Sequence, residues 1–365
     1  MANRFNRTPM GYIRRHPVVL LLLLSPGIPE YLSNSSPLNA IVLNPPAFAV
    51  QLATNLSLYG PGALLVREAM VRWQKGAGSL LLFGSAYGVL EEGTALATLF
   101  NPHAPPVGPF GLYGHWLGVN WVWVAVIIPV HIVYSISLPI LLLSLAVPQS
   151  AGTRLLGGRR LFYAIAILGA DVAFLQLGVA KVEHYWAGPT LVSASLAVVA
   201  SLAILGYALP RNAIKLGRRL QKSSSPVTTA LGLGFYPSVL FTGLAEAANH
   251  VPVYLALISI ILIEGAFLVF AIRSIRLDGN KRPLIALAAG LLLPIEVIGV
   301  ISEARLPITL LADLLMTLFL VWLWKIYPQA VSQALPQPSP KKLTGPAQED
   351  ERPTRGMKDS GDVVK

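Results

Sequence analysis

The sequence contains no cysteine and is poor in charged residues. Without cysteine, the 365-residue chain has no disulfide framework, no thiol nucleophile and no thiolate metal site. Charged residues make up only 12% of the chain, whereas hydrophobic residues make up 54%. This balance excludes an ordinary soluble domain and is typical of a protein with many membrane-spanning segments.

The sequence motifs of several common enzyme classes are also missing. There is no GxxxxGK[ST] motif, so ATP is not expected to drive the protein directly. HExxH and GxSxG are absent as well, which disfavours the standard zinc-dependent and serine-dependent hydrolases. No stretch suggests haem, flavin or nucleotide binding, and the sequence does not identify a cofactor.

The chain contains a series of apolar runs that are long enough to span a membrane. A transmembrane helix needs about 20 apolar residues. The sequence predicts an all-α, polytopic transmembrane bundle of about ten spans within a transmembrane domain at 17–327. The predicted spans lie at 17–33, 38–66, 79–100, 119–148, 161–180, 188–209, 227–247, 251–272, 283–304 and 307–327. The fourth is long enough to tilt, or to bend at Pro129.

Two polar segments flank this domain. Residues 1–16 carry four arginines and are predicted to form a basic cytoplasmic N-terminus. Residues 328–365 are rich in Pro, Gln, Ser and charged residues, which predicts a disordered cytoplasmic tail.

The basic residues give the predicted orientation. If the N-terminus is inside, only Lys181 and Arg305 of the 28 Lys and Arg residues fall in outer loops. Because cytoplasmic loops carry an excess of Lys and Arg, this asymmetry predicts that both termini are inside. It also explains the net charge of +11 without nucleic acid as a partner. We therefore expect a multi-pass protein of the inner or plasma membrane, with the lipid bilayer as its partner.

Two adjacent acids, Glu91 and Glu92, lie near the middle of the span at 79–100. A charge at the bilayer centre costs a few kcal/mol, about 2.5–3.5 on insertion scales, so intramembrane acids are rare and often functional. Small residues between Gly84 and Gly88 precede the pair and allow a neighbouring helix to approach closely. Neighbouring side chains on a helix point about 100° apart. At least one of the two acids must therefore face protein or a cavity.

Other ionisable residues within the predicted spans are His131, Asp171, Glu264, Glu296 and Asp313, of which the first four are candidate site residues. No Lys or Arg lies deep in any span to neutralise them. Such groups suit a proton relay or a Na⁺ pathway. Each also has a structural alternative, because a membrane acid such as Asp171 can donate to a helix carbonyl, and Glu296 can satisfy the backbone freed by Pro294.

A weak internal similarity appears at an offset of 172 residues. LEEG at 90–93 aligns with LIEG at 262–265, and Gly60 and Gly62 align with Gly232 and Gly234. These runs would cross the membrane in opposite directions, which suggests a five-plus-five inverted repeat. This favours a H⁺- or Na⁺-coupled secondary transporter of a small-molecule substrate, with Glu92 and Glu264 as the leading binding residues.

A second hypothesis is a metal-dependent hydrolase that works within the membrane. Glu91 and Glu92, followed about forty residues later by His131, resemble the glutamate-type CAAX-processing and bacteriocin-immunity membrane proteases. That family pairs an EExxxR helix with FxxxH and HxxxN helices. This sequence has Leu96 at the Arg position and Ile127 at the Phe position, and no later span contains HxxxN. The resemblance implies Glu91, Glu92 and His131 as metal ligands.

A third hypothesis is a non-catalytic assembly or immunity component, in which the polar groups only hold helices together. The three hypotheses predict different geometries. A transporter predicts Glu92 and Glu264 around one cavity, whereas a metalloprotease predicts Glu91 or Glu92 within about 4–5 Å of His131. The non-catalytic hypothesis predicts that each acid is hydrogen bonded separately.

Overall fold

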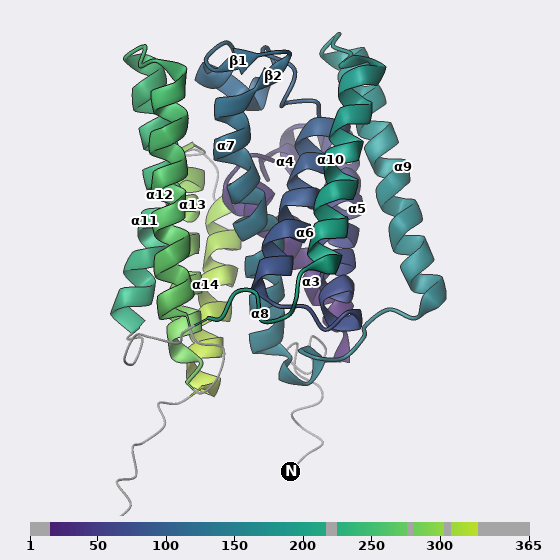
Figure 1. Ribbon diagram of the computed structural model, residues 1–365. Coiled ribbons are helices and arrows are strands. Elements are labelled where there is room, and N and C mark those ends of the chain that lie inside the picture. Colours follow the sequence, from purple (N-terminus) through teal and green to yellow (C-terminus); the bar gives the residue numbers. More distant parts are fainter. Residues whose placement is uncertain (1–14, 217–224, 276–279, 303–307, 328–365) are drawn as a thin grey trace, which may run out of the picture. The chain divides into compact units, whose positions relative to one another are not determined.

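The computed structural model describes residues 15–216, 225–275, 280–302 and 308–327 (Figure 1). The predicted tail at 328–365 and nearly all of the predicted basic N-terminus at 1–16 lie outside these residues. The described chain is helical apart from connecting segments and one short hairpin, which confirms the prediction of an all-α protein.

Each of the ten predicted spans contains helix. The segments from residue 17 to 150 are α3 (Pro17–Pro26), the π-helix η1 (Gly27–Leu32), α4 (Ala40–Leu43), α5 (Pro45–Arg72), α6 (Ala77–Val89), the π-helix η2 (Leu90–Ala95), the 3-10 helix η3 (Pro105–Phe110), β1 (His115–Trp116), β2 (Val119–Asn120), α7 (Trp121–Val130), the π-helix η4 (His131–Ser137), α8 (Leu138–Ala146) and the 3-10 helix η5 (Pro148–Ser150). The later helices are α9 (Gly158–Val182), α10 (Gly188–Ala208), α11 (Ser225–Ala248), α12 (Val253–Ser274), α13 (Arg282–Ser302) and α14 (Ile308–Ile326).

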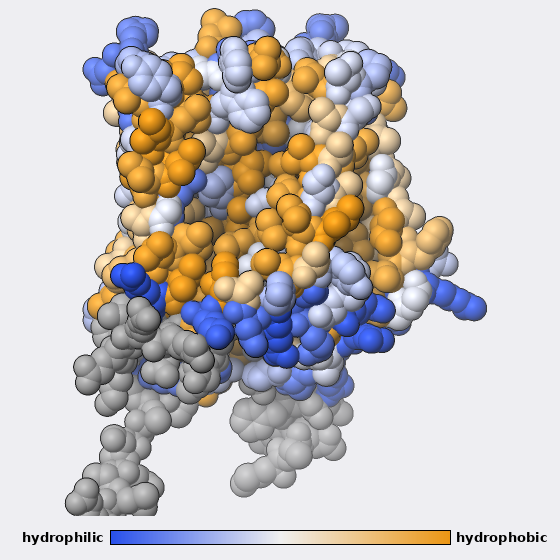
Figure 2. Space-filling view, viewed as in Figure 1, coloured by the Kyte–Doolittle hydropathy of each residue, from blue (hydrophilic) through white to orange (hydrophobic). Residues whose placement is uncertain are grey.

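Six helical segments of the described chain are long and apolar enough to cross a membrane. They are Trp121–Ala146, Gly158–Val182, Gly188–Ala208, Pro226–Ala248, Val253–Arg273 and Arg282–Ile301. Pro17–Leu32 is apolar but shorter. The space-filling view shows a broad apolar band with hydrophilic residues toward both ends (Figure 2). These features support a membrane protein, while the count of ten spans stays a prediction.

Local sequence signals set several helix starts. Asn44 precedes α5, and its side chain accepts a hydrogen bond from the amide of Ala47 at 3.3 Å. Asn120 precedes α7 in the same way and accepts from the amide of Trp123 at 2.9 Å. These caps satisfy amides that have no partner within the helix. Just before α7, strands β1 and β2 form a hairpin whose two turn residues, Leu117 and Gly118, both have positive φ, as a two-residue hairpin turn requires.

Three π-helical turns interrupt the membrane-length runs. The turn η1 follows Pro26, and η4 begins two residues after Pro129. A proline has no amide hydrogen and clashes with the carbonyl four residues earlier, so the hydrogen-bond register shifts there. No proline lies in or just before η2. Residues Glu30, Glu91, Glu92 and His131 all lie on these turns, and π-helical turns occur frequently at functional sites.

Glycines bring the helices around η4 close together. A methyl group on Gly84 would lie 3.3 Å from the Cα of Ile132, and one on Gly88 would lie 3.2 Å from the Cβ of His131. A methyl group on Gly62 of α5 would overlap the ring of Tyr87. The segment that packs against the small residues of α6 is therefore η4, which carries His131. This agrees with the expectation that small residues allow a neighbouring helix to approach closely.

The described Lys and Arg residues lie mostly at one set of helix ends, and Figure 2 shows hydrophilic residues along the lower edge of the molecule. Among the residues that the structure describes, Lys181 is the basic residue at the opposite end, and Arg305 is outside them. At the basic end, buried Arg67 contacts Glu68 at 3.1 Å and also donates to the carbonyls of Ser150 and Thr153. This network fixes the end of α5 to the segment between α8 and α9.

Candidate metal centre

The imidazole of His131 lies between the carboxylates of Glu91 and Glu92. Its Nε2 is 2.7 Å from Oε1 of Glu92, and its Nδ1 is 3.2 Å from Oε2 of Glu91. The three side chains are 4%, 0% and 5% exposed for His131, Glu91 and Glu92. We call these three residues the acid–histidine cluster. Because η2 and η4 both pack against α6, two segments separated by some forty residues meet here.

Glu92 is held by a chain of hydrogen bonds on the side away from His131. Thr98 Oγ1 donates to Oε2 of Glu92, and Trp123 Nε1 donates to Thr98 Oγ1 at 3.2 Å. On the far side of the imidazole, Nδ1 shares a hydrogen bond of 3.0 Å with Ser135 Oγ. Such outer partners fix the orientation of potential ligands. Trp123, which the sequence suggests only as a packing or interface aromatic, belongs to this chain.

Glu91 is in a different situation, because neither of its carboxylate oxygens has a hydrogen bond of good geometry, although the hydroxyls of Tyr59 and Tyr87 lie beside it. The Nδ1 atom of His131 lies within ion-pair distance, but its hydrogen bond goes to Ser135. The hydroxyl of Tyr87, beside Glu91, is also buried without a partner. A buried carboxylate without hydrogen bonds is costly. The donors available to Glu91 are therefore the imidazole of His131 and the neighbouring tyrosine hydroxyls.

Glu30 adds a further acid near this site, and sequence reasoning missed it. Tyr59 donates to Glu30 Oε1 at 2.5 Å, and Ser36 donates to Oε2 at 2.6 Å. The ring of Tyr59 in turn stacks on His131, with ring centroids 6.5 Å apart. The available signal was the position of Glu30 inside the first predicted span, between two prolines and a polar segment.

The donor set suits a divalent metal ion. One ligand atom from each of Glu91, Glu92 and His131 lies within 4.8 Å of the others. Carboxylate and imidazole donors at about 2.0–2.2 Å from a tetrahedral ion lie roughly 3.3–3.6 Å apart, so small side-chain rotations bring these atoms to ligand distance. The set carries two negative charges and at most one positive charge. A cation would compensate that charge and give Glu91 the partner that it lacks.

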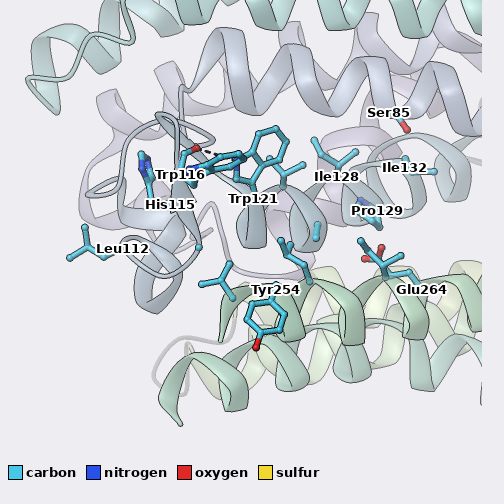
Figure 3. A pocket seen from close by; sticks show the side chains of 16 residues that line it. Ser85, Leu112, His115, Trp116, Trp121, Ile128, Pro129, Ile132, Tyr254 and Glu264 are labelled. Atoms are coloured by element: carbon cyan, nitrogen blue, oxygen red, sulfur yellow. Dashed lines mark hydrogen bonds between the residues drawn. The ribbon is translucent and has the colours of Figure 1, made fainter. Parts of the chain in front are cut away.

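The other predicted site residues do not belong to this group. Asp171 of α9 is 7% exposed, its Oδ2 has no partner, and it lies near Ser57 of α5. Glu296 of α13 has an unpartnered Oε1 and lies near Asp313 of α14. Glu264 of α12 lines a separate cavity, shown in Figure 3.

The proposed inverted repeat stays a prediction. Glu92 and Glu264 occupy aligned positions, but Glu92 lies on a π-helical turn and Glu264 lies within the uninterrupted helix α12. The cavity that Glu264 lines does not include Glu92 among its lining residues.

No family model matches the sequence, and no curated protein and no solved structure matches it either. The functional argument therefore depends on the geometry of this chain.

Proposed function

We propose that Glu91, Glu92 and His131 bind one divalent metal ion, and that the protein is a metal-dependent hydrolase acting within the membrane. The observation that carries the proposal is the convergence of these three buried side chains from η2 and η4. The resemblance to glutamate-type membrane proteases suggests a peptide bond as the substrate.

Each residue has a role that follows from its contacts. Glu92 is oriented by Thr98 and is the best-fixed carboxylate, and Ser135 holds the imidazole of His131. A divalent ion at such a site activates water and polarises a carbonyl. Glu91 has an oxygen to spare for accepting a proton, since its carboxylate has two oxygens and one is enough for ligation. Tyr87 offers an unpartnered hydroxyl as a hydrogen-bond donor beside it.

The departures from the protease family fit this assignment. The family's third motif, HxxxN, is absent from the later spans, so the resemblance offers only Glu91, Glu92 and His131 as ligands. In the structure both adjacent glutamates face His131, so three donors are present without a third motif. Two carboxylates and one imidazole are a ligand set used by catalytic metal sites.

Ion-coupled transport is the second candidate, and Glu264 is the observation that favours it. Its carboxylate lines a cavity of about 1000 Å³ and has an unpartnered oxygen. The predicted arrangement around one cavity shared with Glu92 has no support in the described contacts. A purely non-catalytic role predicts that each acid is hydrogen bonded separately, and Glu91 is not.

We further propose that the basic end faces the cytoplasm, so that both termini are inside, in the inner or plasma membrane. The support is the distribution of Lys and Arg over the helix ends, which follows the positive-inside rule.

Metal analysis and a hydrolysis assay test the proposed function together. The protein, purified in detergent and dialysed against Zn²⁺, is expected to retain about one ion per chain, and His131→Ala to retain none. Glu296→Gln is the matched control because it alters a membrane carboxylate outside the cluster. A labelled peptide with an apolar transmembrane segment should be cleaved only by the metal-loaded protein. Zinc binding without cleavage would reject the hydrolase but keep the metal site, and absence of binding would reject both.

A further inference from the structure

A cleft separates α12 from α7 and the hairpin β1–β2, and its volume is about 1000 Å³ (Figure 3). Its walls are largely aliphatic and aromatic, with Trp116, Trp121 and Tyr254 toward one end and Ile128, Ile132 and Glu264 toward the other. The molecular surface is apolar over these helices (Figure 2). A volume of this size accommodates a drug-sized ligand, and mostly apolar walls with few polar groups are typical of ligand sites.

Glu264 is the only acidic residue among those that line the cleft, and none of the lining residues is Lys or Arg. Its Oε1 atom is buried without a hydrogen-bond partner. In Figure 3 the carboxylate points toward Pro129 and Ile132, across the cleft. Glu264 is eleven residues from the start of α12 at Val253, which places it about 16 Å along the helix. The carboxylate is thus deep in the apolar part.

Three other polar side chains of the cleft are already hydrogen bonded. Ser85 donates to the carbonyl of Leu81 at 2.9 Å, and Trp121 Nε1 donates to the carbonyl of Trp116 at 3.1 Å. His115 Nε2 is 3.0 Å from the carbonyl of Phe100. None of these bonds involves Glu264. The walls therefore do not supply the several oxygen ligands that a hard metal cation needs.

We propose that this cleft binds a lipophilic organic cation of about drug size, such as an aromatic amine. Its positive charge would pair with Glu264, and its apolar groups would contact Ile128, Ile132 and the aromatic residues. Trp and Tyr faces attract cations and aromatic rings. A phospholipid is a poorer fit, because its charged group stays at the membrane surface while Glu264 lies deep. This site is separate from the metal centre and does not depend on the proposed hydrolysis.

Equilibrium binding to the protein in zwitterionic lipid nanodiscs tests the proposal. The probe is tetraphenylphosphonium, and the matched neutral probe is triphenylphosphine oxide. The cation is expected to bind at least tenfold more tightly than the oxide. Glu264→Gln should abolish that preference without weakening oxide binding, whereas Glu296→Gln and His131→Ala should preserve it. Equal affinity of the wild-type protein for the two probes, or an unchanged preference in Glu264→Gln, would overturn the proposal.

A second measurement avoids any dependence on the folding of the variant. A hydrophobic carbodiimide modifies carboxyl groups within the membrane, so its reaction at Glu264 and Glu296 can be followed by peptide mass spectrometry. Tetraphenylphosphonium should slow modification of Glu264 by at least fivefold and leave Glu296 unaffected. Protection of neither residue, or equal protection of both, would show that the cation does not bind beside Glu264.

Discussion

The substitution Glu91→Gln should leave the metal-free protein as stable as the wild type or more stable. In the presence of metal, the same substitution should make the protein less stable than the wild type. The side chain keeps nearly the same size, but the variant loses one negative charge from the acid–histidine cluster. Glu91 is fully buried and neither oxygen has a hydrogen bond. Without metal, the wild-type cluster packs two buried carboxyl groups around one imidazole, and the variant removes one of these two acids. With metal, the wild-type protein gains a ligand that the amide replaces poorly.

The change in the free energy of unfolding can be given an order of magnitude both without and with metal. Leaving a buried polar group unsatisfied costs about 1–3 kcal/mol, so metal-free Glu91→Gln should be as stable as the wild-type protein or more stable by up to that amount. A metal at one hundred times its dissociation constant stabilises the folded protein by about 2.7 kcal/mol. If the variant binds at least tenfold more weakly, it loses about 1.4 kcal/mol or more of that gain.

Thermal unfolding with and without Zn²⁺ measures both changes in stability. The intrinsic fluorescence of the seven tryptophans follows the unfolding. Glu296→Gln is the control: it also removes a membrane carboxylate with an unpartnered oxygen, but it should respond to metal as the wild-type protein does. If metal-free Glu91→Gln is less stable than the wild-type protein by more than 1 kcal/mol, Glu91 has a structural role instead. If metal leaves the wild-type protein unchanged, the metal site is wrong.

Three other predictions follow from single contacts. Gly62→Ala should weaken metal binding about 10–100-fold, because the new methyl group displaces the Tyr87 ring, whose centroid lies 6.2 Å from that of the His131 ring. The control Gly169→Ala, at a glycine with open space around it, should leave metal binding unchanged. Metal titration of both variants tests this prediction. Arg67→Met should destabilise the protein by about 1–3 kcal/mol, because the buried carbonyls of Ser150 and Thr153 lose their donor, while Glu68 keeps its ion pair with Arg72. Exposed Arg160→Met should change stability by less than about 0.5 kcal/mol. Chemical denaturation measures both variants. Because the chain has no cysteine, single Cys substitutions at the exposed residues Gln149 and His103 can report the orientation. Gln149→Cys should react with a membrane-impermeant thiol reagent only from the cytoplasmic side, and His103→Cys only from the outer side. The reverse pattern would reject the proposed orientation.

The helices could be predicted from the sequence because apolar runs of membrane length dominate it. All ten predicted runs contain helix, and the π-helical turn η4 begins two residues after Pro129. The number of times that the chain crosses the membrane is harder to predict from the sequence. The run that contains Glu91 and Glu92 is divided between the 13-residue helix α6 and the π-helical turn η2, so length and composition alone do not identify it as a spanning helix.

Part of the candidate site could also be predicted, and the rest depended on packing. Glu91, Glu92 and His131 stand out as ionisable residues in apolar runs, and the glycines before them indicate a close neighbouring helix. Which helix is that neighbour is decided by contacts such as Gly88 against His131, which no spacing reveals. The same limit applies to Glu264, because its alignment with Glu92 in the sequence says nothing about which cavity each side chain lines.

The π-helical turns link the fold to the proposed chemistry. A register shift to hydrogen bonds five residues apart weakens the local helix, so three such turns in one bundle need compensation from packing. Each turn carries at least one acidic or histidine side chain of the site, and Glu30 connects to His131 through Tyr59. Helix packing alone would be served as well by regular α-helix with apolar side chains. Pro26 and Pro129 account for the register shifts at η1 and η4, whereas no proline accounts for η2. The irregular backbone beside Glu91 and Glu92 is therefore the feature that the proposed metal site would account for.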